Sequence, residues 1–136
     1  MSTALIFVDT NIPMYAMGTP HPHKEPCLQW FKAVAEGHRE AVTDVEVLQE
    51  ILYRYWSIGA MGHGTMVYEQ METIVPTIYS VTRSDVDRAK ELLQEAAGIE
   101  PRDAVHAAVM LNRDVTTIIS YDRHFDRVKG LKRIQP

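Results

Sequence analysis

Hydrophobic residues follow two kinds of pattern that alternate along the chain. Residues 4–8 and 115–119 are continuous apolar or β-branched runs of strand length. Runs of this kind are typical of strands that are buried on both faces of a parallel sheet. Shorter strands are predicted at residues 40–43, 78–81 and 131–134. Between these runs, apolar residues recur at helical spacing.

The predicted helices share an apolar stripe, and most of them end near a glycine. They cover residues 25–36, 44–56, 84–97 and 102–113, with a weaker pattern at 64–73. Ser84 and Asp87 form a capping signature for the third of these helices, whose Val86 and Leu93 are expected to face the core. Strands that alternate with helices predict an α/β fold with a central, mostly parallel β-sheet flanked by helices.

Length and composition place this fold in the class of ordinary globular proteins. The chain has 136 residues, which suits a single domain over residues 1–136, and it is 46% hydrophobic and 24% charged. No apolar run is long enough to cross a bilayer, so we expect no membrane partner. The only cysteine, Cys27, allows no intrachain disulfide and no cysteine-based metal site. A cytoplasmic location is therefore expected.

Three aspartates stand where the predicted elements begin or end. Asp9 and Asp122 follow two of the predicted strands, and Asp103 opens the helix that starts at residue 102. Ligands bind beyond the carboxyl ends of strands in open parallel sheets, so these side chains are expected to share one edge. Each aspartate alone also fits a structural role, as a turn residue, a helix cap or a partner of the helix dipole.

Taken together, the three carboxylates indicate a cation site. Converging carboxylates repel one another, and a bound cation offsets that cost. Oxygen ligands select a hard ion, Mg²⁺ or Mn²⁺. Zinc is disfavoured because neither a His-Glu-x-x-His nor a Cys-x-x-Cys motif is present.

The charge distribution adds a possible contact for phosphate. The net charge is −4, but after Asp122 there are five basic residues and a single acidic residue, Asp126. Such a tail is typical of an electrostatic footprint for nucleic acid and, equally, of a solvated terminus. Arg113, Arg123 and Arg127 are the candidate substrate-binding residues.

Four motifs in order make the chain resemble the PIN-domain nucleases, and specifically the VapC-type toxins of toxin–antitoxin pairs. The resemblance covers nearly the whole length. The motifs are Phe7-Val8-Asp9-Thr10-Asn11, Thr43 with Val47-Leu48-Gln49-Glu50-Ile51-Leu52, Arg102-Asp103-Ala104-Val105-His106-Ala107-Ala108, and Ile119-Ser120-Tyr121-Asp122-Arg123-His124-Phe125-Asp126. Tyr121 departs from the small or polar residue that is usual before the fourth acid.

The resemblance implies a set of site residues. The catalytic and metal-binding acids would be Asp9, Glu50, Asp103 and Asp122, with Asp126 as a further possible ligand and with Asn11 and Ser120 orienting the carboxylates. Glu46 is the rival of Glu50, because both lie on one helix face with Arg54 in a pattern that an ion-pair ladder also produces. His106 is expected to be a core histidine that bonds a backbone group, with contact to substrate as the alternative.

The same resemblance implies a function and partners. It implies a Mg²⁺- or Mn²⁺-dependent endoribonuclease that cleaves RNA by metal-activated water and acts as the toxin of a toxin–antitoxin pair. A small antitoxin protein and a second copy of the chain, in a homodimer, would be its partners. The alternative is a non-catalytic RNA- or protein-binding PIN module. A phosphatase with an aspartyl nucleophile ranks lower, because Asn11 stands where a second acid is needed.

Two further segments are predicted to have structural roles. The stretch from Thr19 to His23 contains two histidines that are able to bind metal, but a surface turn is favoured. An aromatic- and Met-rich group is expected to lie mostly in the core, with some remainder exposed for a partner. It comprises Tyr53, Tyr55, Trp56, Ile58, Met61, Met66 and Tyr68.

Overall fold

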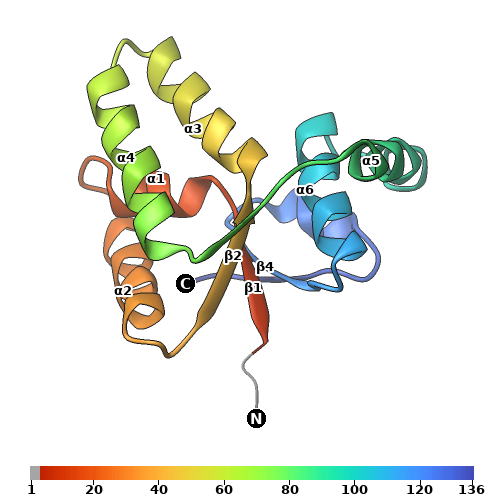
Figure 1. Ribbon diagram of the computed structural model, residues 1–136, viewed down its shortest axis with the longest axis horizontal. Coiled ribbons are helices and arrows are strands. Elements are labelled where there is room, and N and C mark those ends of the chain that lie inside the picture. Colours follow the sequence, from red (N-terminus) through yellow and green to blue (C-terminus); the bar gives the residue numbers. More distant parts are fainter. Residues whose placement is uncertain (1–3) are drawn as a thin grey trace.

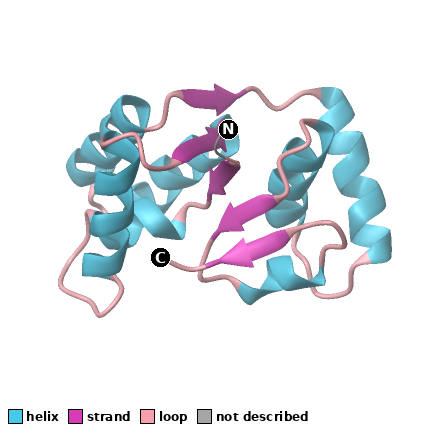
Figure 2. Cartoon of the chain, turned by 90° about the horizontal axis from the view of Figure 1, so that it is seen from below, coloured by secondary structure: helices cyan, strands magenta, loops and turns pink. Residues whose placement is uncertain are grey.

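A five-stranded, fully parallel sheet forms the centre of the molecule (Figures 1 and 2). The computed structural model describes residues 4–136; residues 1–3, which the domain prediction includes, lie outside the described part. The strands are β1 (Leu5–Val8), β2 (Glu40–Asp44), β3 (Thr77–Tyr79), β4 (Thr117–Ile119) and β5 (Lys132–Ile134), in the order β3-β2-β1-β4-β5. The predicted α/β class with a parallel sheet is confirmed.

Helices lie on both sides of the sheet, as Figure 1 shows. One group consists of α1 (Asn11–Ala16), α2 (Lys24–Ala35), α3 (Val45–Ser57) and α4 (Met61–Ile74), and the other of α5 (Arg83–Glu95) and α6 (Pro101–Asn112). A short 3-10 helix, η1 (Arg123–Arg127), connects β4 to β5. Helices therefore cover the apolar strands, which explains why β1 and β4 read as continuous hydrophobic runs.

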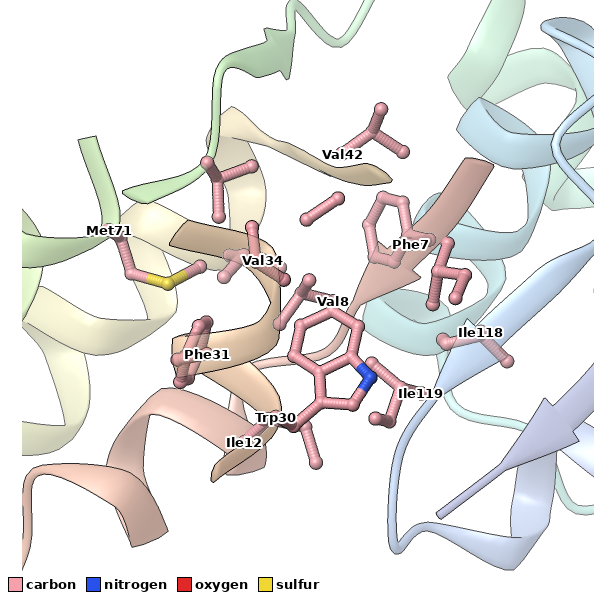
Figure 3. Packing of buried hydrophobic residues seen from close by; sticks show 14 of the residues in the cluster. Phe7, Val8, Ile12, Trp30, Phe31, Val34, Val42, Met71, Ile118 and Ile119 are labelled. Atoms are coloured by element: carbon pink, nitrogen blue, oxygen red, sulfur yellow. The ribbon is translucent and has the colours of Figure 1, made fainter. Parts of the chain in front are cut away.

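The main core packs the first helical group against β1 and β4 (Figure 3). Phe7, Val8, Ile118 and Ile119 are fully buried, and Trp30 of α2 packs in the same cluster. A second cluster joins α5 and α6 through small residues, including Ala89, Ala104, Ala107 and Ala108. Short side chains let these two helices approach closely. The sheet edge that carries the aspartates is thus held from both sides.

The start of α5 differs from the prediction. Thr82 and Asp85, not Ser84 and Asp87, form the capping box, since the side chain of each bonds the backbone N–H of the other. The buried face of the helix consists of Asp85, Ala89 and Leu92, whereas the predicted core residues Val86 and Leu93 are exposed.

Helix α1 was missed by sequence reasoning. Its apolar residues, Ile12 and Ala16, are too few for a recognisable period, and Pro13 argues against a helix interior. Pro13 lies in the first turn, where the missing N–H has no helical partner to lose.

The aromatic- and Met-rich group is mostly exposed, contrary to the prediction. Tyr55 is buried, but Tyr53, Trp56, Ile58, Met61 and Met66 are exposed, with Trp56 at 66% and Ile58 at 71%. These residues belong to α3, to α4 and to the turn between them, a helical hairpin that Figure 1 shows. Among residues 4–136, no helix is long and apolar enough to cross a membrane.

Candidate metal centre

Acidic side chains from four elements line one cavity at the carboxyl ends of the central strands. Asp9 follows β1, Glu50 lies in α3, Asp103 stands in the first turn of α6, and Asp122 precedes η1. All four line a cavity of about 740 Å³. Positions that are far apart in sequence are therefore neighbours, because β1 pairs directly with β4.

Asp9 is held rigidly at the base of this site. Its Oδ1 accepts a hydrogen bond from the Thr10 N–H at 2.9 Å, and its Oδ2 accepts from Ser120 Oγ at 2.5 Å and from Asn11 Nδ2 at 3.1 Å. Burial raises the pKa of Asp9 despite these donors. The structure thus brings both residues that were expected to orient the carboxylates, Asn11 and Ser120, onto one acid.

Asp103 shows most directly that the site concentrates negative charge. Burial, followed by the nearby carboxylates of Asp9 and Asp122, raises the pKa of Asp103 to about 7. Asp103, Asp122 and His124 each offer one ligand atom, and these atoms all lie within 4.8 Å of one another. His124 was not among the predicted site residues; its position two residues after Asp122, at the start of η1, is the available signal.

Of the two rival glutamates of α3, Glu50 is the one that lines the cavity. Its Oε2 accepts from Thr10 Oγ1 at 2.7 Å, and its Oε1 accepts from Arg102 Nη1 at 2.9 Å. Burial raises its pKa, but the His106 ring and the donors Thr10 and Arg102 lower it more, so that the pKa is about 2. Glu46, the rival residue, does not line the cavity.

His106 is a core residue, as expected, but its partner differs from the expected backbone group. Its Nδ1 lies 2.8 Å from Oδ2 of Asp44, which is itself fully buried and caps α3. Its Nε2 points toward Glu50 Oε2 at 3.8 Å, which is too long for a hydrogen bond. His106 therefore ties α6 to α3 behind the acids.

The other predicted residues lie outside the cavity lining. Asp126 is exposed and forms a two-point ion pair with Arg133, at 2.9 and 3.2 Å. Arg113 is committed to buried Asp85, at 2.9 and 3.1 Å, and to two backbone carbonyls. Arg123 and Arg127 are exposed on η1, immediately after Asp122.

The cavity contains two guanidinium groups that sequence reasoning did not single out. Arg54 and Arg102 line it together with the four predicted acids and with a fifth acidic residue, Glu100. Both reach Glu50, Arg54 at 3.5 Å and Arg102 at 2.9 Å. In the sequence, Arg54 was explained by an ion-pair pattern with Glu46 and Glu50 along one helix face. No sequence pattern linked Arg102 to Glu50.

The donor set fits a hard divalent cation. Among the described residues, the ligand atoms that gather within 4.8 Å belong to the carboxylates of Asp103 and Asp122 and to the imidazole of His124. Asp9 and Glu50 line the same cavity, but neither is part of this group. A cation there would offset the repulsion that raises the pKa of Asp103. Such a ligand set suits Mg²⁺ or Mn²⁺.

This charge concentration predicts an unusual pH dependence for the metal-free protein. The pKa of Asp103 is about 7 in the fold and about 3.9 in an unfolded chain, so the unfolded state binds fewer protons between these values. In EDTA, stability contributed at Asp103 is therefore lost as pH rises from about 4 to about 7. Asp103→Asn avoids this loss. The difference between its free energy of unfolding and that of the wild type, measured with urea, is expected to grow by ~1–2 kcal/mol from about pH 5 to about pH 8. A constant difference between these pH values would contradict the placement of the three acids.

Comparison with known proteins identifies the class to which this fold and site belong. The sequence profile of the PIN domain matches residues 6–131, and the chain belongs to the PIN-domain family. Within that family it is 38% identical over 130 residues to the VapC ribonuclease Mb1869c of Mycobacterium bovis and to ribonuclease VapC13 of Mycobacterium tuberculosis. Each alignment covers 96% of this chain and 99% of the relative.

Solved structures confirm the fold. VapC20 of Mycobacterium tuberculosis, described as a sarcin–ricin loop cleaving toxin, superposes with a TM-score of 0.79 at 19% identity, covering 96% of this chain and 99% of that one. VapBC2 of Rickettsia felis, bound to a DNA fragment from its promoter, gives a TM-score of 0.76 at 16% identity, with 97% and 98% coverage. At these identities the likeness concerns the fold.

Proposed function

We propose that this protein is a Mg²⁺- or Mn²⁺-dependent endoribonuclease that acts as the toxin of a toxin–antitoxin pair, built as one PIN-like domain that works in the cytoplasm. One observation carries the proposal: Asp9, Glu50, Asp103 and Asp122 line a single cavity in a chain that is 38% identical to named VapC ribonucleases. The alternative, a non-catalytic binding module, leaves this concentration of acids without a purpose.

The acids of the cavity and their hydrogen-bond donors have separate parts in this proposal. Asp9, Asp103 and Asp122 would hold the ion, with Glu50 completing the acidic set. When bound, the ion supplies Lewis-acid polarisation of the scissile phosphate and lowers the pKa of a water molecule. Asn11 and Ser120 keep the Asp9 carboxylate in one orientation through their hydrogen bonds to Oδ2.

The remaining charged groups are Glu50, which stays ionised, and the arginines that would contact the substrate. Glu50 has a pKa of about 2 and stays ionised at neutral pH, fixed by Thr10 and Arg102. Arg54 and Arg102 are the cavity's candidate phosphate contacts in place of Arg113, because they line the cavity and Arg113 does not. Arg123 and Arg127 on η1 extend positive charge beyond Asp122 for the flanking strand.

The exposed apolar face of the α3–α4 hairpin is the proposed contact for an antitoxin. Trp56 is large, apolar and more than half exposed, and Tyr53 and Met61 adjoin it. Ile58 is exposed as well, but it lines the acidic cavity. Exposed apolar groups of this size mark protein interaction sites. Solved relatives include the VapBC complexes from Rickettsia felis and Salmonella typhimurium. A homodimer is part of the same proposal.

The decisive experiment is RNA cleavage by the purified chain. Total bacterial RNA should be cut in Mg²⁺ or Mn²⁺ and left intact in EDTA, with activity restored when excess Mg²⁺ is added back. Cleavage ends should be mapped by sequencing to separate this activity from a contaminating nuclease. Equal cleavage in EDTA would overturn the metal-dependent mechanism. Binding of RNA without cleavage in either metal would favour the non-catalytic module.

A further inference from the structure

Four aromatic rings gather beside the acidic cavity in what we call the tyrosine–histidine cluster: Tyr15, His21, His23 and Tyr121. His23 stacks on Tyr121 with ring centroids 3.8 Å apart and an interplanar angle of 13°. Tyr15 packs edge-on against both of these rings, at 5.0 and 5.5 Å. His21 lies over Tyr15, at 4.6 Å and 36°. The rings come from α1, the loop before α2, and the end of β4.

The loop that carries the two histidines is locally ordered. The His23 N–H donates to His21 Nδ1 at 3.0 Å, which fixes the plane of the His21 ring. Lys24 Nζ donates to the Gly18 carbonyl at 2.7 Å and closes the loop. Pro20 and Pro22 restrict the backbone on either side of His21. The rings are therefore preorganised, and binding on them would cost little conformational entropy.

The cluster adjoins the acids directly. Tyr15 and His21 line the same cavity as Asp9, Asp103 and Asp122. Tyr121 precedes Asp122, and its N–H donates to Asn11 Oδ1 at 3.3 Å, while Asn11 Nδ2 donates to Asp9 at 3.1 Å. A ligand whose phosphate is held by a cation at the acids, and which has a flat ring beside that phosphate, would thus contact both parts of the cavity.

We propose that Tyr15 and His21 form a stacking subsite for an unpaired nucleobase of the RNA strand, next to the phosphate that a cation bound at the acids would hold. This rests on the proposed ribonuclease function and adds how the strand is held. Tyr15 is partly buried and anchored by two neighbouring rings, whereas His21 is exposed. His21 is therefore the ring that a base reaches without disturbing the core. Stacking on aromatic rings selects unpaired bases, since paired bases present no free face.

The test compares His21 variants on RNA with and without bases. Binding of a fluorescein-labelled A12 oligoribonucleotide and of an abasic ribose-phosphate 12-mer is measured by anisotropy in Ca²⁺. The wild type should prefer A12, and His21→Ala should lose about fivefold or more in affinity for A12 but little for the abasic strand. His21→Phe keeps a flat ring but lacks the Nδ1 acceptor, and it should restore most of the preference. His38→Ala, an exposed histidine before β2 at the opposite edge of the sheet, is the matched control and should match the wild type.

The outcomes separate this inference from the proposed function. Thermal unfolding of His21→Ala should stay close to that of the wild type, because the side chain is exposed and its loss removes one surface hydrogen bond and one ring contact. If the wild type cuts RNA in Mg²⁺ but binds both strands equally, or if His21→Ala weakens both equally, the stacking subsite is overturned and the ribonuclease stands. If the wild type neither binds nor cuts RNA, both proposals fall.

Discussion

Replacing Asp103 by Asn is expected to lower RNA cleavage by about 100-fold or more while leaving the fold intact. Asp103 lies among Asp9, Asp122 and His124, and the nearby carboxylates contribute to a pKa of about 7. The amide keeps the shape of the side chain but removes a negative charge from the cation site. Its loss should weaken metal binding and, with it, stabilisation of the charge that develops on the phosphate.

The measurement is single-turnover RNA cleavage over a range of Mg²⁺ concentrations, with circular dichroism to establish folding. Glu46→Gln is the matched control, because it removes a carboxylate from α3 that does not line the cavity. It should retain most of the activity. Full activity in Asp103→Asn, or an equal loss in Glu46→Gln, would show that the acids of this cavity do not perform the reaction.

The second large effect is expected on the free energy of unfolding, at an aspartate that does not line the acidic cavity. Asp85→Ala should lower the free energy of unfolding by ~2–3 kcal/mol. Asp85 is 1% exposed and accepts hydrogen bonds from Asn112 and Arg113 of the α6 end and from Thr82 at its own helix start. Its removal leaves Arg113 without its carboxylate and deletes half of the capping box of α5.

Urea unfolding at pH 7 measures this loss, with Asp87→Ala as the control. Asp87 lies on the same helix, but its side chain is 60% exposed and pairs with Arg83 at 3.8 Å, so its effect should be near zero. Burial raises the pKa of Asp85, but its donors, Arg113 first among them, hold it below the ordinary value. The difference between wild type and Asp85→Ala should therefore shrink as pH falls below about 4. A pH-independent difference would contradict the ion pair.

The fold could be predicted from the sequence where one physical requirement dominated. Residues 4–8 and 115–119 are apolar on both faces because helices cover both faces of the sheet, and short runs of this kind seldom arise in a strand with a solvated face. The start of α5 could not be predicted, since Thr82, Ser84, Asp85 and Asp87 offer two overlapping capping boxes. The choice depends on which aspartate finds buried partners, and those partners lie at the end of α6.

The candidate site could be predicted from the sequence only where local features decided the position of a residue. The ends of β1 and β4 and the start of α6 are local features, and they placed Asp9, Asp122 and Asp103 at one edge. Glu50 could not be chosen over Glu46 from the helical pattern alone. The choice depends on how α3 is rotated about its axis, and two acids one turn apart do not reveal that rotation. The pairings of Arg113 with Asp85 and of His106 with Asp44 are long-range choices among several chemically equivalent partners.

The pairing of β1 with β4 also has a consequence during protein synthesis. The chain is made from its N-terminus, so the residues before α6 can form β1, β2 and β3 and the helices around them while they hold only Asp9 and Glu50 of the acidic set. Asp103 and Asp122 arrive later, and the edge is complete only when β4 has inserted beside β1. Closing a contact over so many residues is slow relative to local helix formation. A chain made only as far as α5 therefore lacks Asp103, Ser120 and Asp122, and the acidic site is assembled only after β4 has been made.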